Sequence, residues 1–428
     1  MGPDITGAWT PSTLGQVATW LSGGTPSKAN PAFWAGALPW VSPKDMKVFR
    51  LGDTEDHISD RGAESGSRTV PGGAVFVVVR GMILAHTFPV CLAGREMAFN
   101  QDVKAGIPGP GLSGGFLGHW LVGNSHGLLG IVTEATHGTK RIELRDFTSF
   151  KIRVPTPPEQ ARIAEVLDTL DDAIRTTEQV IAKLEMVKRG LMHDLLTNGI
   201  DENGELRDPV RHPERFKDSP LGRVPSEWEP APLRDLCERI TDGTHQTVHT
   251  TERMAGTVPF LYVSSVRDGR VRWDDAGRID ASVFRQISLG REPRAGMVLY
   301  TAVGSYGHAA VVEAFREFSF QRHLACLYPR PALNGRFLAE WLNSAAGRSF
   351  ANKAAIGNAQ KTVTLTALKS CVVPLPPLAE QLLIGARAAG LSRLLDAQAS
   401  TLAKLRLLKK GLADDLLTGR VRVAVASP

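Results

Sequence analysis

The chain contains one long helical pattern twice, and this duplication limits the folds that it can adopt. In both copies a Glu-Gln pair follows a proline-rich entrance. A glycine stands 31 positions after the glutamate, so that Glu159 is matched with Gly190 and Glu380 with Gly411. Apolar residues recur in steps of four and three, which is the 3.5-residue period of a coiled-coil seam. About 38 residues of helix would be about 57 Å long and could not bury this seam alone. The sequence therefore predicts that the two copies pack against each other.

The predicted seam occupies equivalent positions, 221 residues apart, in the two copies. Its apolar members are Ile163, Leu167, Leu170, Ile174, Ile181, Leu184, Leu191 and Leu195 in the first copy, and Ile384, Leu391, Leu395, Leu402, Leu405, Leu412 and Leu416 in the second. Its polar interruptions match too, and are Thr177 and Lys188 in the first copy and Gln398 and Lys409 in the second. We expect the lysines to set the register of the seam, since long lysines can extend out of it. A generic dimerisation helix is the alternative, but two copies in one chain favour an intramolecular pair.

The regions that precede the helical copies are also related, at offsets of 219 to 222 residues. Matching stretches are Ser22-Gly-Gly-Thr25 with Thr241-Asp-Gly-Thr244, Trp40-Val-Ser42 with Tyr262-Val-Ser264, Phe99-Asn-Gln-Asp-Val103 with Phe320-Gln-Arg-His-Leu324, and Lys140-Arg-Ile142 with Lys361-Thr-Val363. Short apolar runs at 74–80 and 297–302 predict buried strands, and residues 116–121 and 336–342 have the spacing of short amphipathic helices. The chain is therefore a tandem repeat of a β-rich module followed by a helix.

The predicted fold class is α+β. Two mixed, β-rich domains in tandem repeat are separated by two long helices, which pair with each other as a coiled coil. The predicted boundaries are 1–154 for the first domain, 155–199 for the first helical spacer, 200–227 for a linker, 228–373 for the second domain, 374–420 for the second helical spacer and 421–428 for a C-terminal tail. The linker is rich in charge, proline and glycine and too long for a tight turn, so we expect it to be partly ordered against the first helix.

Composition narrows the functional classes. Hydrophobic residues make up 43 % of the 428, enough to form cores. The longest apolar run is too short to span a bilayer, and the N-terminus lacks the features of a signal peptide, which predicts a cytoplasmic protein. Cys91, Cys237, Cys326 and Cys371 show neither pairing nor metal spacing, as in a reducing compartment. A net charge of +6 mildly favours an anionic partner.

Several catalytic or ligand-binding motifs lack their usual context. Residues 109–114 fit GxGxxG, but the neighbouring prolines favour a loop over the strand and helix that a dinucleotide site needs. Residues 111–115 fit GxSxG, yet nothing marks the histidine and acid partners of a nucleophile. His245 and His249 have a possible metal spacing downstream of Cys237, but the surrounding residues favour a polar loop. The sequence has no GxxxxGK[ST] loop and no Asn/Asp-Pro-Pro-Tyr/Phe motif, so neither ATP hydrolysis nor adenine methylation by this chain is predicted.

A family resemblance rests on the helical copies. Each begins with Pro-x-Pro-Pro before Glu-Gln and ends with Lys-Arg/Lys-Gly-Leu-x-x-Asp-Leu-Leu-Thr. This resembles the conserved regions of the specificity subunit of Type I restriction-modification systems, and the modules resemble its target recognition domains. Supporting stretches are Ser22-Gly-Gly-Thr-Pro-Ser27, Trp40-Val-Ser-Pro-Lys-Asp-Met46, Asn100-Gln-Asp-Val-Lys-Ala105 and Ile240-Thr-Asp-Gly-Thr-His245. The resemblance covers essentially the whole chain.

The resemblance implies a DNA-binding subunit in phage defence. Each recognition domain would read one half of a bipartite double-stranded DNA target. The two helices would form an antiparallel coiled coil with a pseudo-two-fold axis and would set the gap between the half-sites. The chain itself would be non-catalytic and without a cofactor. It would carry two modification subunits, which use S-adenosylmethionine to methylate adenine, and restriction subunits that need ATP and Mg²⁺. Two alternatives remain, a fused restriction or modification enzyme and a coiled-coil adaptor that does not bind DNA.

Polar and basic residues in the modules are the candidates for DNA contact. They are Lys28, Ser42, Lys44, Lys47, Asn100, Gln101, Lys104 and Lys140 in the first module, and Thr244, His245, Ser264, Arg267, Arg270, Arg272, Arg322, His323, Gln360 and Lys361 in the second. Arginine and lysine contact phosphates, and arginine can also read guanine in the major groove. For most individual residues a solvated charged surface is the simpler interpretation.

Overall fold

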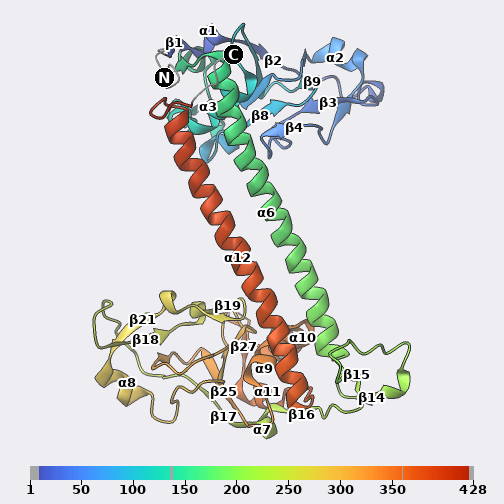
Figure 1. Ribbon diagram of the computed structural model, residues 1–428, viewed down its shortest axis with the longest axis vertical. Coiled ribbons are helices and arrows are strands. Elements are labelled where there is room, and N and C mark those ends of the chain that lie inside the picture. Colours follow the sequence, from blue (N-terminus) through green and yellow to red (C-terminus); the bar gives the residue numbers. More distant parts are fainter. Residues whose placement is uncertain (1–8, 135–137, 359, 424–428) are drawn as a thin grey trace, which may run out of the picture. The chain divides into compact units, whose positions relative to one another are not determined.

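The structure is a computed structural model that describes residues 9–134, 138–358 and 360–423 (Figure 1). The chain forms two compact units. Unit 1 comprises residues 1–179 and 400–428, and unit 2 comprises residues 180–399. Each unit therefore combines one globular module with part of each long helix, α6 (Pro157–Thr197) and α12 (Leu378–Leu416).

The long helices form where the repeated pattern predicts them. Proline suits the first turn of a helix because it lacks an N–H donor and pre-sets φ. Every apolar residue of the predicted seam is buried or half-buried. In unit 1 Lys409 of α12 contacts Asp171 of α6, and Arg406 lies 2.7 Å from Glu178. Residue numbers thus rise along one helix as they fall along the other, so the helices are antiparallel within this unit.

The two seam lysines contact equivalent residues of the opposite helix. In unit 2 the Nζ of Lys188 donates to the hydroxyl of Ser392 at 2.8 Å. Lys188 and Lys409 are equivalent in the two copies, and so are their partners Ser392 and Asp171. Each lysine therefore has a hydrogen-bonding partner on the opposite helix, as a register-setting residue requires.

Unit 1 contains a five-stranded sheet in the order β2-β10-β7-β8-β4 and a four-stranded sheet in the order β5-β3-β9-β6. The strands are β1 (Thr10–Thr13), β2 (Ala18–Ser22), β3 (Leu38–Val41), β4 (Arg50–Leu51), β5 (His57–Ile58), β6 (Thr69–Val70), β7 (Val75–Val78), β8 (Val90–Ala93), β9 (Met97–Phe99), β10 (Val103–Pro108), β11 (Thr133–Glu134), β12 (Lys140–Arg141) and β13 (Lys151–Val154). The helices are α1 (Leu14–Val17), α2 (Asp60–Gly66), α3 (Gly114–Gly123), α4 (Ser125–Leu129) and α5 (Leu144–Thr148). The predicted strand at 74–80 is β7, and the predicted helix at 116–121 lies within α3. Fully buried Phe76, Phe99 and Phe116 fill the core.

Unit 2 repeats this arrangement with sheets in the orders β17-β25-β22-β23 and β21-β18-β24. Its main strands are β16 (Ala231–Pro232), β17 (Cys237–Asp242), β18 (Thr257–Leu261), β19 (Val266–Arg267), β20 (Arg270–Val271), β21 (Gly277–Asp280), β22 (Val298–Thr301), β23 (Ala309–Val311), β24 (Ser319–Phe320), β25 (Leu324–Pro329), β26 (Ala355–Ile356), β27 (Thr362–Val363) and β28 (Val372–Val373). The helices are α7 (Leu233–Leu236), α8 (Ala281–Ile287), α9 (Gly335–Asn343), α10 (Ala345–Ala354) and α11 (Leu365–Ser370). The predicted strand at 297–302 is β22, and the predicted helix at 336–342 is α9.

Strand pairing corrects two of the matches between the modules. Val41 pairs with Phe99 in parallel, and Leu261 pairs with Phe320 in the same way, so Val41 is equivalent to Leu261. The match of Trp40-Val-Ser42 with Tyr262-Val-Ser264 was therefore wrong by two residues. The match of Ser22 with Thr241 was wrong by one residue. Gly23 packs against the Phe99 carbonyl as Gly243 packs against the Phe320 carbonyl, so these two glycines are equivalent. Identical residues gave an incorrect sequence alignment at these two places, because the hydrogen bonds between strands decide which residues are structurally equivalent.

The segment predicted as a linker is ordered within unit 2. It contains the hairpin of β14 (Phe216–Ser219) and β15 (Gly222–Pro225). Ile200 is 1 % exposed and belongs to the core of the unit. The side chain of Arg207 is 8 % exposed. Residues 200–227 are therefore structural parts of unit 2.

A buried glutamate at the start of each long helix ties it to its module. The Glu380 carboxylate accepts hydrogen bonds from Arg207 Nη1 at 2.6 Å, from Trp228 Nε1 at 3.2 Å and from the Ile200 amide at 2.8 Å. The equivalent residues in unit 1 are Glu159, Trp9 and Arg422. The arginine comes from the segment after α6 in unit 2 and from the segment after α12 in unit 1. In both units the main partners of the glutamate are these long-range donors.

The glutamine that follows each of these glutamates forms hydrogen bonds with the turn before α3 in unit 1 and before α9 in unit 2. Gln160 accepts from the Ser113 amide at 2.7 Å and donates to the Gly111 carbonyl at 2.9 Å. Gln381 does the same with the Asn334 amide and the Ala332 carbonyl, at 2.7 and 2.9 Å. The GxGxxG stretch is thus part of the turn that the helix docks on.

The remaining sequence expectations concern cysteines, membranes and metals. All four cysteines are buried free thiols. Within the residues that the structure describes, no helix is long and apolar enough to cross a membrane. Nor do those residues contain three or more histidine, cysteine or acidic side chains grouped as a metal would need.

Candidate nucleic-acid interface

One turn occupies the same place in both modules. In unit 1 it joins β9 to β10, and its tip is Gln101. The Asn100 amide donates to the Val41 carbonyl at 2.9 Å, and the Val79 amide donates to the Asp102 carbonyl at 2.9 Å. The turn is thus bonded to strands of both sheets, which fixes its backbone.

The equivalent turn in unit 2 joins β24 to β25, and its tip is Arg322. The Gln321 amide donates to the Leu261 carbonyl at 3.1 Å, and the Ala302 amide donates to the His323 carbonyl at 2.9 Å. These bonds match those of unit 1 one for one. We call residues 100–102 and 321–323 the tip turns.

A second loop lies against each tip turn without any space between the backbones. A Cβ atom on Gly23 would lie 2.1 Å from the Phe99 carbonyl oxygen, and one on Gly243 would lie 2.2 Å from the Phe320 oxygen. The loop that follows each glycine therefore borders the turn. This loop carries Thr25 in unit 1 and includes Thr244 and His245 in unit 2.

A two-stranded hairpin, β11–β12 in unit 1 and β26–β27 in unit 2, contacts the segment that follows β7 or β22. The Gly81 amide donates to the Lys140 carbonyl at 2.9 Å, and the Gly304 amide donates to the Lys361 carbonyl at 3.0 Å. Three separate segments of each module therefore meet at one edge. Of the predicted DNA-binding residues, this edge carries Asn100, Gln101, Lys104, Lys140, Thr244, His245, Arg322, His323, Gln360 and Lys361.

Unit 1 holds two neighbouring cations beside its tip turn. Partial burial, and then the positive charge of Arg68, lower the pKa of Lys104. The Lys104 amine donates to the hydroxyl of Ser22. Arg68 follows Ser67, whose hydroxyl donates to the Phe99 carbonyl at 2.9 Å, next to the tip turn. An anion bound near these two cations would relieve their repulsion. Arg68 was missed by sequence reasoning, since nothing local distinguishes it from a solvated arginine.

The tip-turn side chains of the two units differ in their partners. In unit 1 the Thr25 hydroxyl donates to Gln101 Oε1 at 2.6 Å. In unit 2 His245 occupies the place of Thr25 and lies 2.8 Å from Asp242. Gln101 and Arg322 are both exposed. Asn100 is buried and its amide oxygen accepts from the backbone of the turn, so it supports the turn from inside.

The other predicted DNA-binding residues of unit 1 lie on other segments. Ser42 is buried and donates to Asp45 at 2.7 Å. Lys44 forms ion pairs with Glu55 and Asp56, each at 2.9 Å. Lys47 is exposed, and Lys28 lies 5.9 Å from the ring centre of Trp34. Their contact with DNA stays a prediction.

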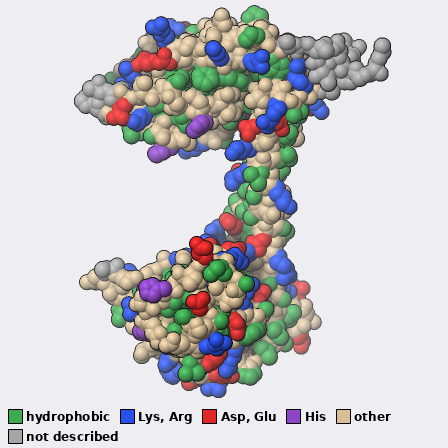
Figure 2. Space-filling model, turned by 90° about the vertical axis from the view of Figure 1, so that its left-hand side faces the viewer, with side chains coloured by type: hydrophobic (Ala, Val, Ile, Leu, Met, Phe, Trp, Pro, Cys, Tyr) green, Lys and Arg blue, Asp and Glu red, His purple; other side chains and the backbone are tan. Residues whose placement is uncertain are grey.

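Three arginines of unit 2 that were predicted to contact DNA have partners within the protein. Arg270 pairs with Asp396 of α12, and Arg272 pairs with Asp268 at 2.6 Å. Arg267 donates to its neighbouring carbonyl at 3.1 Å, and Ser264 is exposed. On the face shown in Figure 2, basic and acidic side chains are interspersed in each unit. Selective recognition would therefore depend on individual side chains rather than on one basic surface.

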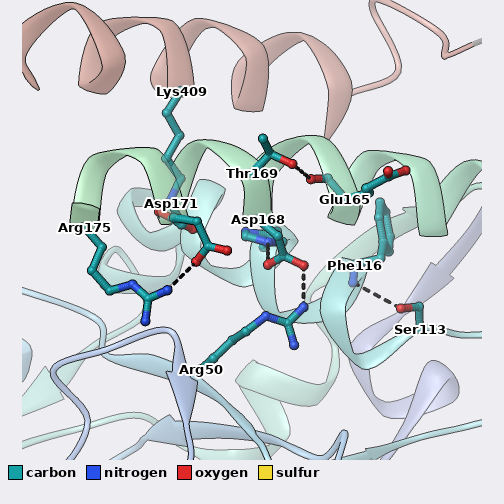
Figure 3. A network of polar contacts seen from close by, with 11 residues as sticks. Arg50, Ser113, Phe116, Glu165, Asp168, Thr169, Asp171, Arg175 and Lys409 are labelled. Atoms are coloured by element: carbon teal, nitrogen blue, oxygen red, sulfur yellow. Dashed lines mark hydrogen bonds and ion pairs between the residues drawn. The ribbon is translucent and has the colours of Figure 1, made fainter. Parts of the chain in front are cut away.

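The junction between module and helix differs between the units. In unit 1 Asp168 of α6 bonds Arg50 (Figure 3). Asp168 also lies 3.0 Å from Nε2 of His119, and Phe49 stacks on His119 with ring centres 4.1 Å apart. Burial lowers the pKa of His119, against the effect of Asp168. In unit 2 the equivalent positions hold Glu340 and Ala389, and they line a groove of about 1000 Å³.

Acid should destabilise unit 2 through His308. Burial, and then the positive charges of Arg348 and Arg267, lower the pKa of His308 from 6.5 to about 4, while Asp268 acts in the opposite direction. The unfolded chain therefore binds a proton more readily. The stability that this group contributes is complete above pH 6.5 and falls as the pH drops from 6.5 towards 4. Urea unfolding of wild type and His308→Gln across this range should show a shallower pH dependence in the variant. Equal slopes would contradict the prediction.

The chain matches one family model twice. The model for the Type I restriction modification DNA specificity domain matches residues 7–186 and 225–405. The chain is 33 % identical over 177 residues to the Type I restriction enzyme EcoR124I/EcoR124II specificity subunit of Escherichia coli, which covers 41 % of this chain and 44 % of that protein. It is 23 % identical over 298 residues to the Type I restriction enzyme MjaVIII specificity subunit of Methanocaldococcus jannaschii, which covers 67 % and 65 %. The matches therefore span less than two thirds of either relative.

Two solved structures share the fold. The first is the S subunit of a Type-I restriction-modification system from M. genitalium, with a TM-score of 0.59, 15 % identity, and coverage of 97 % of this chain and 99 % of that chain. The second is a chain from a study of complex assembly and conformational transition of the type I R-M system. Its TM-score is 0.54 and its identity 19 %, with 97 % and 98 % covered. Similarity at these identities bears on the fold alone.

Proposed function

The chain belongs to the Type I restriction modification DNA specificity family, and from this we propose that it is the DNA sequence-recognition subunit of a Type I restriction-modification complex. Each module binds one half of a bipartite target, and the paired helices set the gap. The observation that carries this proposal is the repeated tip turn, which presents polar side chains at the same place in both modules. Duplex DNA has local two-fold symmetry, so duplicated modules suit two half-sites.

The chemistry of the complex belongs to its partners in this proposal. The chain is non-catalytic and resides in the cytoplasm. Two modification subunits bind S-adenosylmethionine and methylate adenine, and restriction subunits use ATP and Mg²⁺ to cleave. The absence of a phosphate-binding loop and of an adenine-methyltransferase motif from the sequence supports this division.

The adenine methylome tests the proposal. The chain would be expressed with its modification subunit in a host that lacks DNA methylation. We expect a split motif, with two defined tracts around a fixed unspecified gap. A complex that forms but methylates nothing would favour a coiled-coil adaptor. Binding of S-adenosylmethionine by the isolated chain would favour a fused enzyme.

Lengthening both helices should widen the gap. A heptad inserted between Gln179 and Val180, and another between Ser400 and Thr401, preserves the seam because these positions lie opposite each other in the antiparallel pairing. Each helix gains about 10 Å at 1.5 Å per residue, which is about three base pairs of DNA. The methylome should show both tracts unchanged and the gap about three pairs longer. An unchanged gap would exclude the helices as a ruler, and one insertion alone serves as a register-breaking control.

An apolar pair on each long helix is suited to bind a modification subunit. Met186 and Val187 of α6 are 64 % and 56 % exposed, and the equivalent Leu407 and Leu408 of α12 are 71 % and 51 % exposed. Burial of each side chain is worth about 1.5–3 kcal/mol. Replacing either pair with glutamates should weaken the binding of one modification subunit by at least about a hundredfold. Native mass spectrometry of the complex would count the subunits that remain. The exposed Leu289→Glu is the control, and full occupancy in both double variants would contradict this docking surface.

A further inference from the structure

The tip turns place two different side chains at one equivalent point. Each turn is held by the same backbone hydrogen bonds, and each is bordered by the same loop and hairpin. Gln101 and Arg322 both extend from the exposed tip. A side chain fixed at one point of a repeated module meets the same position of each half-site.

The two side chains have hydrogen-bonding groups that suit different bases. A glutamine amide can bond adenine through N6 and N7, whereas an arginine fork matches the O6 and N7 acceptors of guanine. We propose that Gln101 reads adenine in one half-site and that Arg322 reads guanine at the equivalent place in the other. This inference rests on the proposed function and adds the bases that the two tip turns recognise.

Thr25 is the positioning residue for Gln101. Its hydroxyl donates to Gln101 Oε1 at 2.6 Å, which orients the amide with its oxygen on one side and its NH₂ group on the other. The oxygen keeps a second lone pair for adenine N6. The amide nitrogen lies 3.5 Å from Asp102 Oδ2, and its second N–H group remains for adenine N7. Unit 2 has His245 in this place, bonded to Asp242. An arginine fork needs no such choice, because all of its polar atoms are donors.

Neighbouring cations supply contacts that do not depend on sequence. In unit 1 Lys104 bonds Ser22, and Arg68 follows Ser67, which bonds Phe99 at the start of the tip turn. In unit 2 Lys361 lies at the bordering hairpin. Phosphate contacts of this kind position a protein, whereas base contacts specify the sequence. The same edge therefore offers both kinds of contact.

Exchange of the two side chains tests the proposal. Gln101→Arg and Arg322→Gln would each be expressed in the full chain with the modification subunit, and the methylome would be read. In Gln101→Arg one base pair of one tract should change from A·T to G·C. In Arg322→Gln one pair of the other tract should change from G·C to A·T. The other tract and the gap should stay as in the wild type. The preference for the original base should fall about fivefold to a hundredfold.

Three further variants separate base recognition from positioning and from phosphate contact. Thr25→Val should reduce discrimination at the Gln101 base pair alone, and Thr25→Ser should restore it. Lys104→Gln should weaken binding to all DNA sequences to the same extent and reduce the salt dependence of binding. A wild-type methylome without a split motif would overturn the proposed function. A split motif that stays identical in both exchange variants would overturn this inference while leaving the proposed function intact.

Discussion

Glu380→Gln is expected to lower the free energy of unfolding by about 3 kcal/mol or more. The side chains of Glu380 and Arg207 are only 6 % and 8 % exposed, so the variant removes the buried charge partner of Arg207 and leaves it only the exposed Glu227, at 3.0 Å. The carboxylate also accepts from the Trp228 indole and the Ile200 amide. Glutamine keeps the size of the side chain but removes the charge, so the loss reports electrostatics rather than a cavity. Urea unfolding followed by tryptophan fluorescence would measure it.

The equivalent variant in unit 1 is the matched comparison. Glu159 is 3 % exposed, but Arg422 is 24 % exposed and can recover hydration. Glu159→Gln should therefore cost less, about 1–2 kcal/mol. A second test combines Glu380→Gln with Arg207→Met, which removes both charges and should recover part of the stability. If Glu380→Gln unfolds like the wild type, the buried cluster does not hold α12 to its module.

Gly243→Ala is expected to abolish recognition of one half of the target. A Cβ at this position would lie 2.2 Å from the Phe320 oxygen and 2.3 Å from the Gln321 oxygen, so the tip turn of unit 2 must move. A misplaced turn loses its base contacts together, and each good contact is worth about 1–3 kcal/mol. Binding to the bipartite target should weaken at least about a hundredfold at constant salt. Fluorescence anisotropy with the complete complex would measure the change.

The control is a glycine of the same unit with open surroundings. Gly390 lies within α12, and a Cβ there would have no neighbour within 4 Å. Gly390→Ala should bind DNA normally and gain up to about 1 kcal/mol of stability, because alanine favours a helix. Gly23→Ala should impair the other half-site in the same way as Gly243→Ala. Normal binding by a folded Gly243→Ala variant would show that the tip turn does not contact DNA.

The repeated helices could be derived from the sequence because a seam period is a local property. The seam from Ile163 to Leu195 repeats every 3.5 residues, and each residue is buried or half-buried as predicted. The strand β7 and the helix α3 followed from apolar runs and spacing within a few residues. The match of Phe99–Val103 with Phe320–Leu324 is also confirmed, since both segments form the same turn.

The composition of the DNA-facing edge depended on the tertiary structure. Thr25 and Gln101 are 76 positions apart, and only the pairing of strands brings them into contact. Strand pairing also corrected two matches between the modules. An extra residue in a loop shifts the sequence alignment, but it leaves the pairing of the strands unchanged.

The sequence by itself determined the duplication, the two long helices and their seam, since these follow from short periods and from comparison of the chain with itself. Only the tertiary structure decided what the Glu-Gln pairs do. Glu380 meets Arg207 at a distance of 173 positions, and Glu159 meets Arg422 at 263. Nothing near either glutamate in the chain marks its partner, because a buried ion pair depends on how distant segments close around a core and on which charges are left without water.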